Sequence, residues 1–166
     1  MKASHKIGLG GGCHWCTEAV FQQLKGVQGV EQGYISSDNA NFNLSEAIIV
    51  HFEPKLISLA KLIEIHLYTH QSTSNHSFRK KYRSAVYYFT KDQKNESVKI
   101  ITALQEDFSK SIVTKVLKFN EFESSREEIQ NYYSKDPNKP FCKIHIEPKL
   151  QILLKQFKDN LNLNDT

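Results

Sequence analysis

The reactive side chains of this sequence gather in one short run near the amino terminus, Gly10-Gly11-Gly12-Cys13-His14-Trp15-Cys16. The glycines predict a flexible loop and the apolar spacing after them predicts a helix, so that Cys13 would lie in the first turn of that helix. Unpaired amides and the positive end of the helix dipole favour a thiolate there by up to about 2 kcal/mol. Since one pKa unit corresponds to about 1.36 kcal/mol, this placement moves a cysteine pKa from about 8.5 towards 7. We therefore predict that Cys13 is a nucleophile.

Cys16 follows Cys13 at the spacing of one helical turn. A thiol at that distance can attack an oxidised Cys13 sulfur and close the small disulfide ring of Cys-x-x-Cys redox sites. Two other interpretations stay open. A structural zinc ion needs four ligands, which Cys13, Cys16, Cys142 and a histidine could supply, although the chain has no second Cys-x-x-Cys. All three thiols could also be buried and inert, which fits poorly with the triple glycine before Cys13.

Composition and charge describe one soluble globular domain. The chain has 166 residues, of which 39% are apolar, and its 22 Lys and Arg against 18 Asp and Glu give a net charge of +4. No apolar run approaches the roughly 20 residues of a bilayer crossing, and we find no export signal. We therefore expect a cytoplasmic protein with no membrane partner, whose three cysteines serve chemistry rather than a disulfide framework. So small a net charge gives little support for nucleic-acid binding, and we expect none.

The first ninety residues predict elements in the order strand, helix, strand, strand, helix, strand. These elements are residues 6–9, 13–25, 27–35, 45–52, a helix after Ser58 that contains Leu59 to Leu67, and residues 84–89. In the first helix, Glu18 and Gln22 fall opposite the apolar residues and are predicted to face water, and Gly26 ends the helix. This order is the split βαβ arrangement of a ferredoxin-like antiparallel sheet, so the predicted fold class is α+β.

The rest of the chain is predicted to add helices and a loop to that core. The expected elements are a helix over about 92–108, a strand over 113–119, a helix opened by the capping box Ser125-Arg126-Glu127-Glu128 and ended by Pro137 and Pro140, a loop with Cys142, and a last helix bearing Leu150, Leu153, Leu154 and Phe157. We therefore predict a single catalytic domain over 1–166, with a core over about 6–90, an extension over about 91–158 and a polar tail over 159–166.

Several motifs in order resemble those of the peptide-methionine (S)-S-oxide reductases, and the resemblance runs from about Lys6 to Phe157. It rests first on Gly-Gly-Gly-Cys-x-Trp-Cys-Thr-Glu-Ala-Val-Phe at 10–21, then on Gly33-Tyr34, Glu46-Ala47 and Tyr82-Arg83-Ser84. Near the carboxyl terminus, Tyr132-Tyr133, Pro140-Phe141-Cys142 and Ile146-Glu147-Pro148-Lys149 fit the family pattern. The ferredoxin-like core that the family shares agrees with the element order above.

The resemblance implies a reaction. Cys13 attacks the sulfoxide sulfur of an oxidised methionine, methionine leaves, and a sulfenic acid remains on Cys13. Cys16 or Cys142, or both in sequence, then resolve it as a disulfide, which a thioredoxin-like dithiol reduces. No metal or cofactor takes part.

The resemblance also assigns the other catalytic roles. Glu46 delivers a proton to the sulfoxide oxygen, since an unprotonated oxide is a poor leaving group. In its predicted strand Glu46 shares a face with Ile48, and an apolar environment raises the pKa of a carboxyl and keeps its proton. Tyr34 and Tyr82 donate hydrogen bonds to the same oxygen, and Trp15 forms an apolar wall against the substrate methyl group.

Two positions beside this site depart from the family pattern. The family usually has Phe where this chain has His14, whose ring can still pack against a methyl group but adds a titratable proton beside the thiolate. The family's Asp-x-Gly-Thr-Gln-Tyr-Arg-Ser is replaced by residues 77–84, so that its acid becomes Ser77. We predict that His14, Trp15 and Ser77 bind substrate, and that His14 changes the pH profile rather than the reaction. The replacement also creates a basic cluster at Arg79, Lys80, Lys81 and Arg83. This cluster is either solvated loop surface or a docking site for acidic proteins.

We therefore predict a monomeric, thiol-dependent oxidoreductase that reduces methionine S-sulfoxide, free or in proteins, to methionine. A general thiol-disulfide oxidoreductase on the same scaffold is the first alternative, and it applies if Ser77 and His14 have destroyed sulfoxide binding. The second alternative is a zinc-binding interaction module built on Cys13, Cys16 and Cys142.

Overall fold

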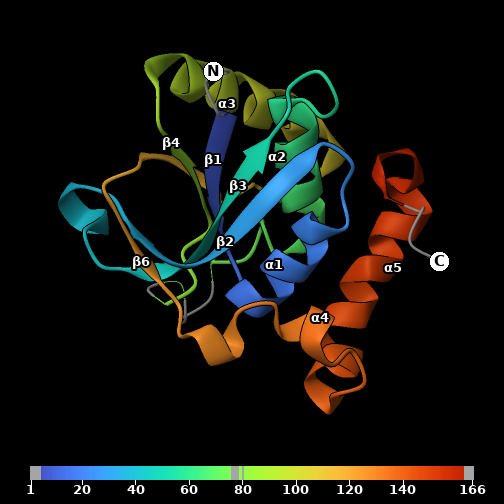
Figure 1. The fold of residues 1–166 in the computed structure, drawn as a ribbon. Coiled ribbons are helices and arrows are strands. Elements are labelled where there is room, and N and C mark those ends of the chain that lie inside the picture. Colours follow the sequence, from blue (N-terminus) through green and yellow to red (C-terminus); the bar gives the residue numbers. More distant parts are fainter. Residues whose placement is uncertain (1–4, 76–78, 80, 163–166) are drawn as a thin grey trace.

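The computed structural model describes residues 5–75, 79 and 81–162 and has a six-stranded sheet at its centre (Figure 1). The strands are β1 (His5–Gly10), β2 (Val27–Ser36), β3 (Ser45–Phe52), β4 (Ala85–Tyr88), β5 (Lys115–Lys118) and β6 (Glu121–Ser124). They lie in the order β5-β4-β1-β3-β2-β6. All neighbouring pairs are antiparallel except β4 and β5, which are parallel. The predicted antiparallel pairing of the four core strands is therefore confirmed, and β5 lies parallel to β4 because the helix between them carries the chain back to its starting end.

The helices are α1 (His14–Gln22), α2 (Leu59–Thr69), α3 (Lys91–Leu104), α4 (Tyr132–Lys135) and α5 (Glu147–Gln156). α2 begins where the sequence predicts, and the Ser58 hydroxyl accepts a hydrogen bond from the Lys61 amide at 3.0 Å. α1 is shorter than predicted: it ends at Gln22, before the turn in which Gly26 has a φ of +88°. Cys13 is the residue immediately before α1, so its thiol lies at the helix amino terminus.

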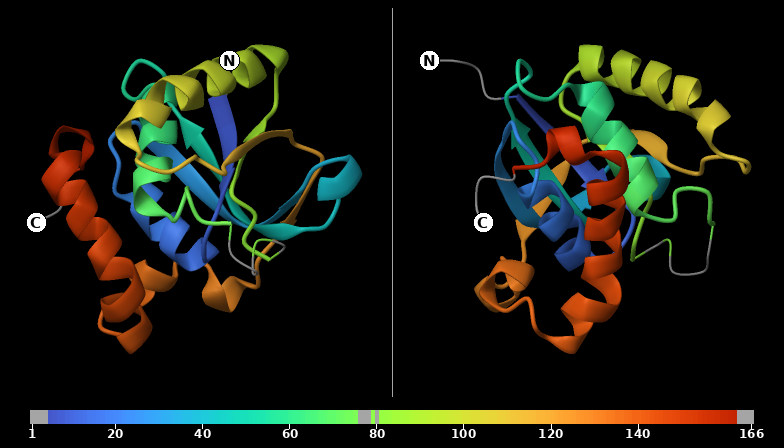
Figure 2. Two further views of the ribbon diagram at one scale, coloured as in Figure 1. Left: turned by 180° about the vertical axis from the view of Figure 1, so that it is seen from behind. Right: turned by 90° about the vertical axis from the view of Figure 1, so that its right-hand side faces the viewer.

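The main core lies between the sheet and the helices, which stand to one side of the strands in Figure 2. Ile7 and Leu9 of β1 pair with Val50 and Ile48 of β3, so that all four side chains share the helix-covered face. Side chains from α1, α2 and α5 cover this face, among them Val20, Phe21, Leu62, Ile63 and Leu153. Strand β3 and helix α1, which carry Glu46 and the residues after Cys13, are therefore held in place by the core.

The sheet is curled so far that its two edges approach one another. β5 and β6 are its edge strands, yet only Phe119 and Asn120 separate them in the chain. Such a link spans at most about 11 Å, whereas six flat strands would hold the edges about 24 Å apart. The Phe119 and Asn120 amides donate to the carbonyls of Tyr88 and Ser36, each at 3.0 Å. A second core fills the inside of the curl, formed by Ile35, Ala47, Ile49, Ala85 and Tyr87.

The carboxyl-terminal extension departs from its predicted elements in three places. The expected helix at Ser125 is replaced by a short turn over Glu127–Ile129 and the single turn of α4, because the Ser125 amide continues the β2–β6 pairing by donating to Gln32 O at 3.1 Å. Strand β6 was not predicted at all. The expected loop at Cys142 is a helical segment, Cys142–Ile146, that leads into α5.

Candidate active site

The loop between β1 and α1 is shaped by His66 of α2, which is buried, and by His70 at the carboxyl end of α2, which is half-buried. His66 Nε2 lies 2.8 Å from the Gly10 carbonyl oxygen, and the His70 ring stacks on His66 with 4.1 Å between centroids. Gly11 has a φ of +154°, and a Cβ there would lie 2.5 Å from His70 Cδ2. Only glycine fits this approach, which fixes the direction from which the chain reaches Cys13.

The Cys13 thiol is strongly activated. Contact with the Cys16 thiol is the largest of the effects that lower the pKa of Cys13 to about 5; burial opposes them, and His14 and the Trp15 amide lower it further. The predicted lowering of the Cys13 pKa is therefore confirmed, but its main cause is the Cys16 thiol rather than the helix terminus alone. At neutral pH the Cys13 sulfur is a thiolate.

All three cysteines belong to one cluster, and all are free thiols. Cys16 and Cys142 are buried together with Ala19 and Ile146, and Cys13 packs against them. The Cys13 thiolate, followed by burial, raises the pKa of Cys16, and burial raises the pKa of Cys142. Of the three thiols, Cys13 is therefore the one whose thiolate is favoured, and so the one suited to act as the nucleophile.

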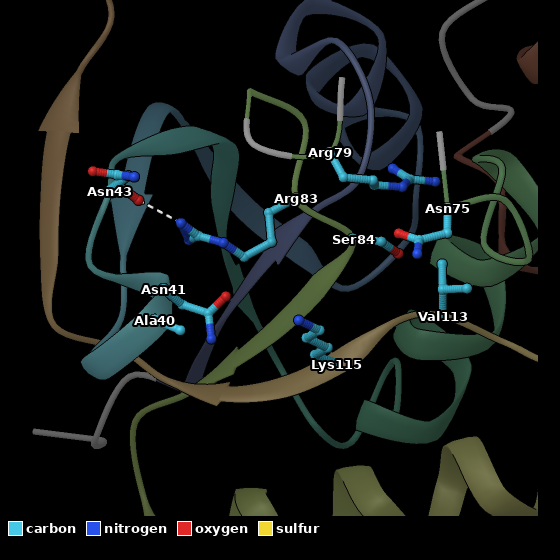
Figure 3. A pocket seen from close by; sticks show the side chains of 9 residues that line it. All are labelled: Ala40, Asn41, Asn43, Asn75, Arg79, Arg83, Ser84, Val113 and Lys115. Carbon is cyan, nitrogen blue, oxygen red and sulfur yellow. Dashed lines mark hydrogen bonds between the residues drawn. The ribbon is translucent and has the colours of Figure 1, made fainter. Parts of the chain in front are cut away.

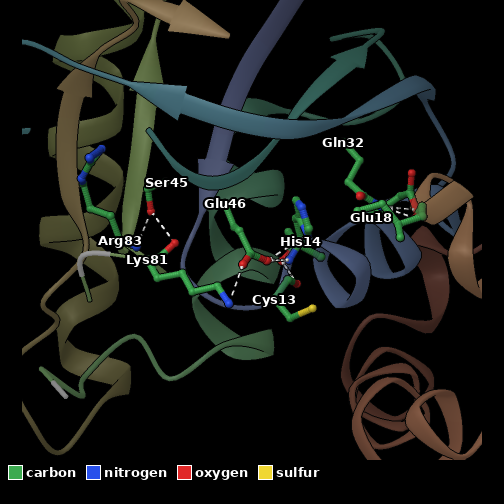
Figure 4. Close-up of polar contacts among 10 residues, drawn as sticks. Cys13, His14, Glu18, Gln32, Ser45, Glu46, Lys81 and Arg83 are labelled. Carbon is green, nitrogen blue, oxygen red and sulfur yellow. Dashed lines mark hydrogen bonds and ion pairs between the residues drawn. The ribbon is translucent and has the colours of Figure 1, made fainter. Parts of the chain in front are cut away.

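Glu46 of β3 lies between His14 and Lys81, as Figure 4 shows. Its Oε1 is 2.9 Å from His14 Nδ1 and accepts the His14 backbone N–H at 3.2 Å, and its Oε2 is 3.7 Å from Lys81 Nζ. Cys13 Sγ, a ring nitrogen of His14 and a carboxylate oxygen of Glu46 all lie within 4.8 Å of one another. The nucleophile and two groups able to move a proton therefore meet at one point.

The predicted rise in the pKa of Glu46 is wrong. Burial does raise it, but the His14 ring and backbone and the Lys81 ammonium outweigh burial and hold the pKa below its ordinary value. Burial lowers the pKa of His14, while contacts with Cys13 and Glu46 outweigh that effect and raise it. The alternation of β3 could not reveal this, because the deciding partner comes from α1.

The structure brings the predicted tyrosines to the same place. Tyr34 of β2 is the cross-strand partner of Glu46, and its ring centroid is 5.2 Å from that of His14. Tyr82 is held beside β3 by Ser45, whose hydroxyl donates to Lys81 O and accepts from the Arg83 amide, both at 2.8 Å. These two hydrogen bonds of Ser45 are a structural role that sequence reasoning missed.

A pocket of about 530 Å³ opens on the thiols. Its lining consists of Gly11, Gly12, Cys13, Cys16, His70, Gln71, Tyr82, Phe141, His145 and Lys149. Trp15 stacks on Tyr132 at 4.4 Å and meets the edge of Phe141 at 5.0 Å, so it supports this wall from behind. Ser77, the third predicted substrate-binding residue beside His14 and Trp15, lies outside the described residues.

Half of the predicted basic cluster turns inward. Arg79 donates to four backbone carbonyls, those of Gly11, Gln71, Ser74 and Tyr82. Arg83 is buried and donates to Tyr87 Oη at 3.2 Å and to Asn43 O. Both arginines line a smaller pocket of about 180 Å³ together with Lys115 (Figure 3). Lys81 is exposed and Lys80 is outside the described residues, so the arginines hold the loop rather than form a basic surface.

Two further charged residues lie where the sequence did not predict them. Glu18 is 2% exposed, not solvent-facing, and accepts a hydrogen bond from Gln32 Nε2 at 2.9 Å. Lys149 donates to Thr69 O at the pocket, and burial lowers its pKa while the Cys16 and Cys13 sulfurs oppose that effect. Both belong to the motifs that carry the family resemblance, which was the available signal.

The donor atoms do not favour a zinc site. Within the described ranges, the one group of three such donors closer than 4.8 Å is Cys13, His14 and Glu46, and Cys16 and Cys142 are not part of it. The Lys81 ammonium beside Glu46 opposes a second cation there. The arrangement suits proton transfer better than metal binding.

No helix within the described part of the chain has the length and apolar character to cross a membrane.

Comparison with known proteins agrees with the geometry. A family model described as peptide methionine sulfoxide reductase matches residues 5–161. The chain is 34% identical to a peptide methionine sulfoxide reductase MsrA of Trichodesmium erythraeum, over 94% of this chain and 97% of that one. It is 31% identical to an MsrA of Sulfolobus acidocaldarius, over 93% and 96%.

The fold is shared with solved structures of lower identity. Reduced Mxr1 of Saccharomyces cerevisiae has a TM-score of 0.76 at 22% identity, covering 86% of this chain and 91% of that one. Methionine sulfoxide reductase A of Corynebacterium diphtheriae has a TM-score of 0.72 at 20% identity, covering 84% and 78%. As its motifs predict, the chain belongs to the peptide methionine sulfoxide reductase family of oxidoreductases.

Proposed function

We propose that this enzyme reduces methionine S-sulfoxide, free or in proteins, with Cys13 as the nucleophile. The observation that carries the proposal is the Cys13 thiol, which has a pKa of about 5, lines a pocket and lies within 4.8 Å of both a His14 nitrogen and a Glu46 oxygen. The thiolate attacks the substrate sulfur, and the oxygen passes to Cys13 with one proton from the His14–Glu46 pair. Cys13 is oxidised to a sulfenic acid and the substrate sulfur is reduced to a thioether, a two-electron exchange that balances.

Six residues contact or orient the substrate in this proposal. The Tyr34 and Tyr82 hydroxyls donate hydrogen bonds to the sulfoxide oxygen as negative charge develops on it. Trp15, with Phe141 in front of it, forms the apolar wall for the methyl group. Ser77 and the face of the His14 ring remain proposed substrate contacts.

Cys16 resolves the sulfenic acid first in this proposal, because its thiol already contacts the Cys13 sulfur. Its proton and the hydroxyl of the sulfenic acid leave as water, and a Cys13–Cys16 disulfide forms. Cys142, in the same buried cluster, can pass the disulfide outward. A thioredoxin-like dithiol then reduces it; support comes from the structure of yeast Mxr1 solved in complex with Trx2.

The organisation that accompanies this function is also proposed. We infer that β4, β1, β3 and β2 with α1 and α2 form a ferredoxin-like split βαβ unit, since these strands lie in that order and pair antiparallel. The whole chain acts as one catalytic domain. A monomer suffices, because one chain supplies every residue of the site, and a reducing cytoplasm suits three thiols that must be regenerated.

The test is a methionine-release assay with separated S and R epimers of a methionine sulfoxide peptide, using dithiothreitol as reductant. Wild-type protein should reduce only the S epimer, and Cys13→Ser should abolish the reaction. Peptide mapping after one equivalent of substrate should find Cys13–Cys16 or Cys13–Cys142. Turnover of a model disulfide without turnover of either sulfoxide would instead identify a general thiol-disulfide oxidoreductase.

A further inference from the structure

His14 is the residue at which this chain differs from the family beside the nucleophile, and the structure packs it directly against the predicted acid. It is the first residue of α1 and only 3% exposed. The same Glu46 oxygen lies 2.9 Å from its Nδ1 and accepts its backbone N–H at 3.2 Å, so that one carboxylate fixes both the ring and the start of the helix. A phenylalanine at this position would keep the backbone hydrogen bond but leave Glu46 without the ring contact.

The ring is free to hold a proton for the reaction. Neither ring nitrogen has a linear hydrogen-bond partner within the described residues, so charge holds the His14–Glu46 contact and Nε2 is unpartnered. The titratable or charged groups around His14 come from α1 and its cap, β2, β3 and the segment before β4: Cys13, Glu18, Tyr34, Glu46 and Lys81.

These surroundings leave the proton on the imidazole. Contacts with His14 and Lys81 hold the pKa of Glu46 below its ordinary range, and contacts with Cys13 and Glu46 raise the pKa of His14. These contacts therefore favour a carboxylate, which has no proton to give, beside an imidazolium, which has one.

The distances suit a transfer to substrate oxygen. The Cys13 sulfur and a His14 nitrogen lie within 4.8 Å. A sulfoxide whose sulfur contacts Cys13 carries its oxygen about 1.5 Å from that sulfur, so an oxygen turned towards His14 can lie within the roughly 3 Å over which a side chain donates a proton.

We propose that His14 is the immediate proton donor to the sulfoxide oxygen, and that Glu46 is the positioning residue that holds its imidazolium. The inference rests on the proposed function. In the step, the Cys13 thiolate forms a bond to the substrate sulfur and the His14 proton passes to the sulfoxide oxygen. As that oxygen then moves to Cys13, the substrate S–O bond and the transient S–S bond both break. The products are methionine, the Cys13 sulfenic acid and neutral His14, which takes up a proton from water before the next turnover.

The experiment is single-turnover methionine release from the S epimer between pH 5 and pH 9, with wild type, His14→Phe and Glu46→Gln. In His14→Phe the remaining acid is a carboxyl, whose ordinary pKa lies about 2 units below that of imidazole. Without His14, burial is again the largest effect on Glu46 and raises its pKa, so the protonated fraction at pH 7.5 and the rate should fall by at most about 100-fold. The alkaline limb of the profile should move to lower pH. The double variant, His14→Phe with Glu46→Gln, should be slower than His14→Phe, because it also lacks the carboxyl that remains in that variant.

The matched control is a second His–Glu pair on the same sheet. His51 Nε2 lies 2.6 Å from Glu31 Oε2 on the surface, so His51→Phe removes an equivalent contact without touching the site. Its profile should match wild type. His14→Gln keeps a polar side chain of similar size and should lose as much activity as His14→Phe. In each variant, the pH dependence of Cys13 alkylation by iodoacetamide measures the thiolate separately, so loss of the acid is distinguished from loss of the thiolate.

The inference is overturned if His14→Phe and His14→Gln keep the wild-type rate within about twofold and the wild-type alkaline limb while Glu46→Gln loses activity. That result would identify Glu46 as the proton donor. Failure of the proposed function looks different: wild-type protein would reduce neither epimer, or Cys13→Ser would remain active.

Discussion

Replacing Cys16 by alanine should raise the pKa of Cys13 most of the way to that of an ordinary thiol. The Cys16 contact is the largest cause of the lowered pKa, which stands at about 5. Without it, burial opposes only the His14 and Trp15 contacts, and we expect a pKa in the range of about 7 to 8.5. At pH 6 the thiolate fraction then falls from about 90% to below about 10%.

The measurement is a titration of thiolate absorbance at 240 nm, supported by the pH dependence of Cys13 alkylation followed by mass spectrometry. The midpoint is the correct quantity, because a thiolate of higher pKa is intrinsically more nucleophilic and partly offsets its lower abundance in any single rate. Cys16→Ser keeps a hydrogen-bond donor and should keep a low midpoint. Cys142→Ser removes a thiol that is not among the causes and should leave the midpoint unchanged.

The result that refutes the reasoning is a Cys16→Ala midpoint equal to that of wild type. The helix terminus and His14 would then be sufficient to hold the thiolate. Equal rises in Cys16→Ala and Cys16→Ser would also contradict it, because the donor would be irrelevant and only the packing of a second sulfur would matter.

Three other substitutions test how the site is built. Gly11→Ala places a Cβ against His70 at a positive φ and should lower the free energy of unfolding by about 1 to 3 kcal/mol in urea. Arg79→Met leaves four backbone carbonyls without their donor, and thermal unfolding should show a loss of about 2 kcal/mol or more. For Lys149, burial lowers the pKa in the folded chain, so the unfolded chain binds more protons and wild-type stability rises with pH between the lowered value and 10.5. Lys149→Met should be more stable than wild type at pH 7 and lose that rise, which urea unfolding at pH 7 and pH 10 measures; a variant less stable at pH 7 would contradict the sign.

The sequence could predict the elements whose cause is local. Ser58 caps α2 through its own hydroxyl, and the apolar alternation of residues 45–52 matches β3 because its side chains alternate between two cores. The thiol at the start of α1 was equally readable, since the glycines and the helical spacing stand side by side in the chain.

The features that the sequence missed arise from partners far apart in the chain. The curl of the sheet arises because β5 and β6, neighbours in the chain, pair with strands on opposite sides of the sheet, β4 and β2. No short stretch of sequence reveals that pairing. Glu18 reads as solvent-facing until Gln32 is placed beside it. Glu46 reads as a neutral acid in an apolar strand until His14, 32 residues away, contributes its ring and its amide to the same oxygen.

The unequal acidity of the three thiols gives the proposed relay a direction. In a Cys13–Cys16 disulfide, the sulfur that departs more readily is the one whose thiolate is more stable, and that is Cys13. An attacking thiolate from Cys142 therefore adds to the Cys16 sulfur and releases Cys13 as the thiolate that the next sulfoxide needs. Attack in the opposite sense would expel Cys16, whose pKa the cluster raises. The contact that activates Cys13 thus also makes it the first sulfur to be regenerated, so the proximity of the two thiols serves both halves of the cycle.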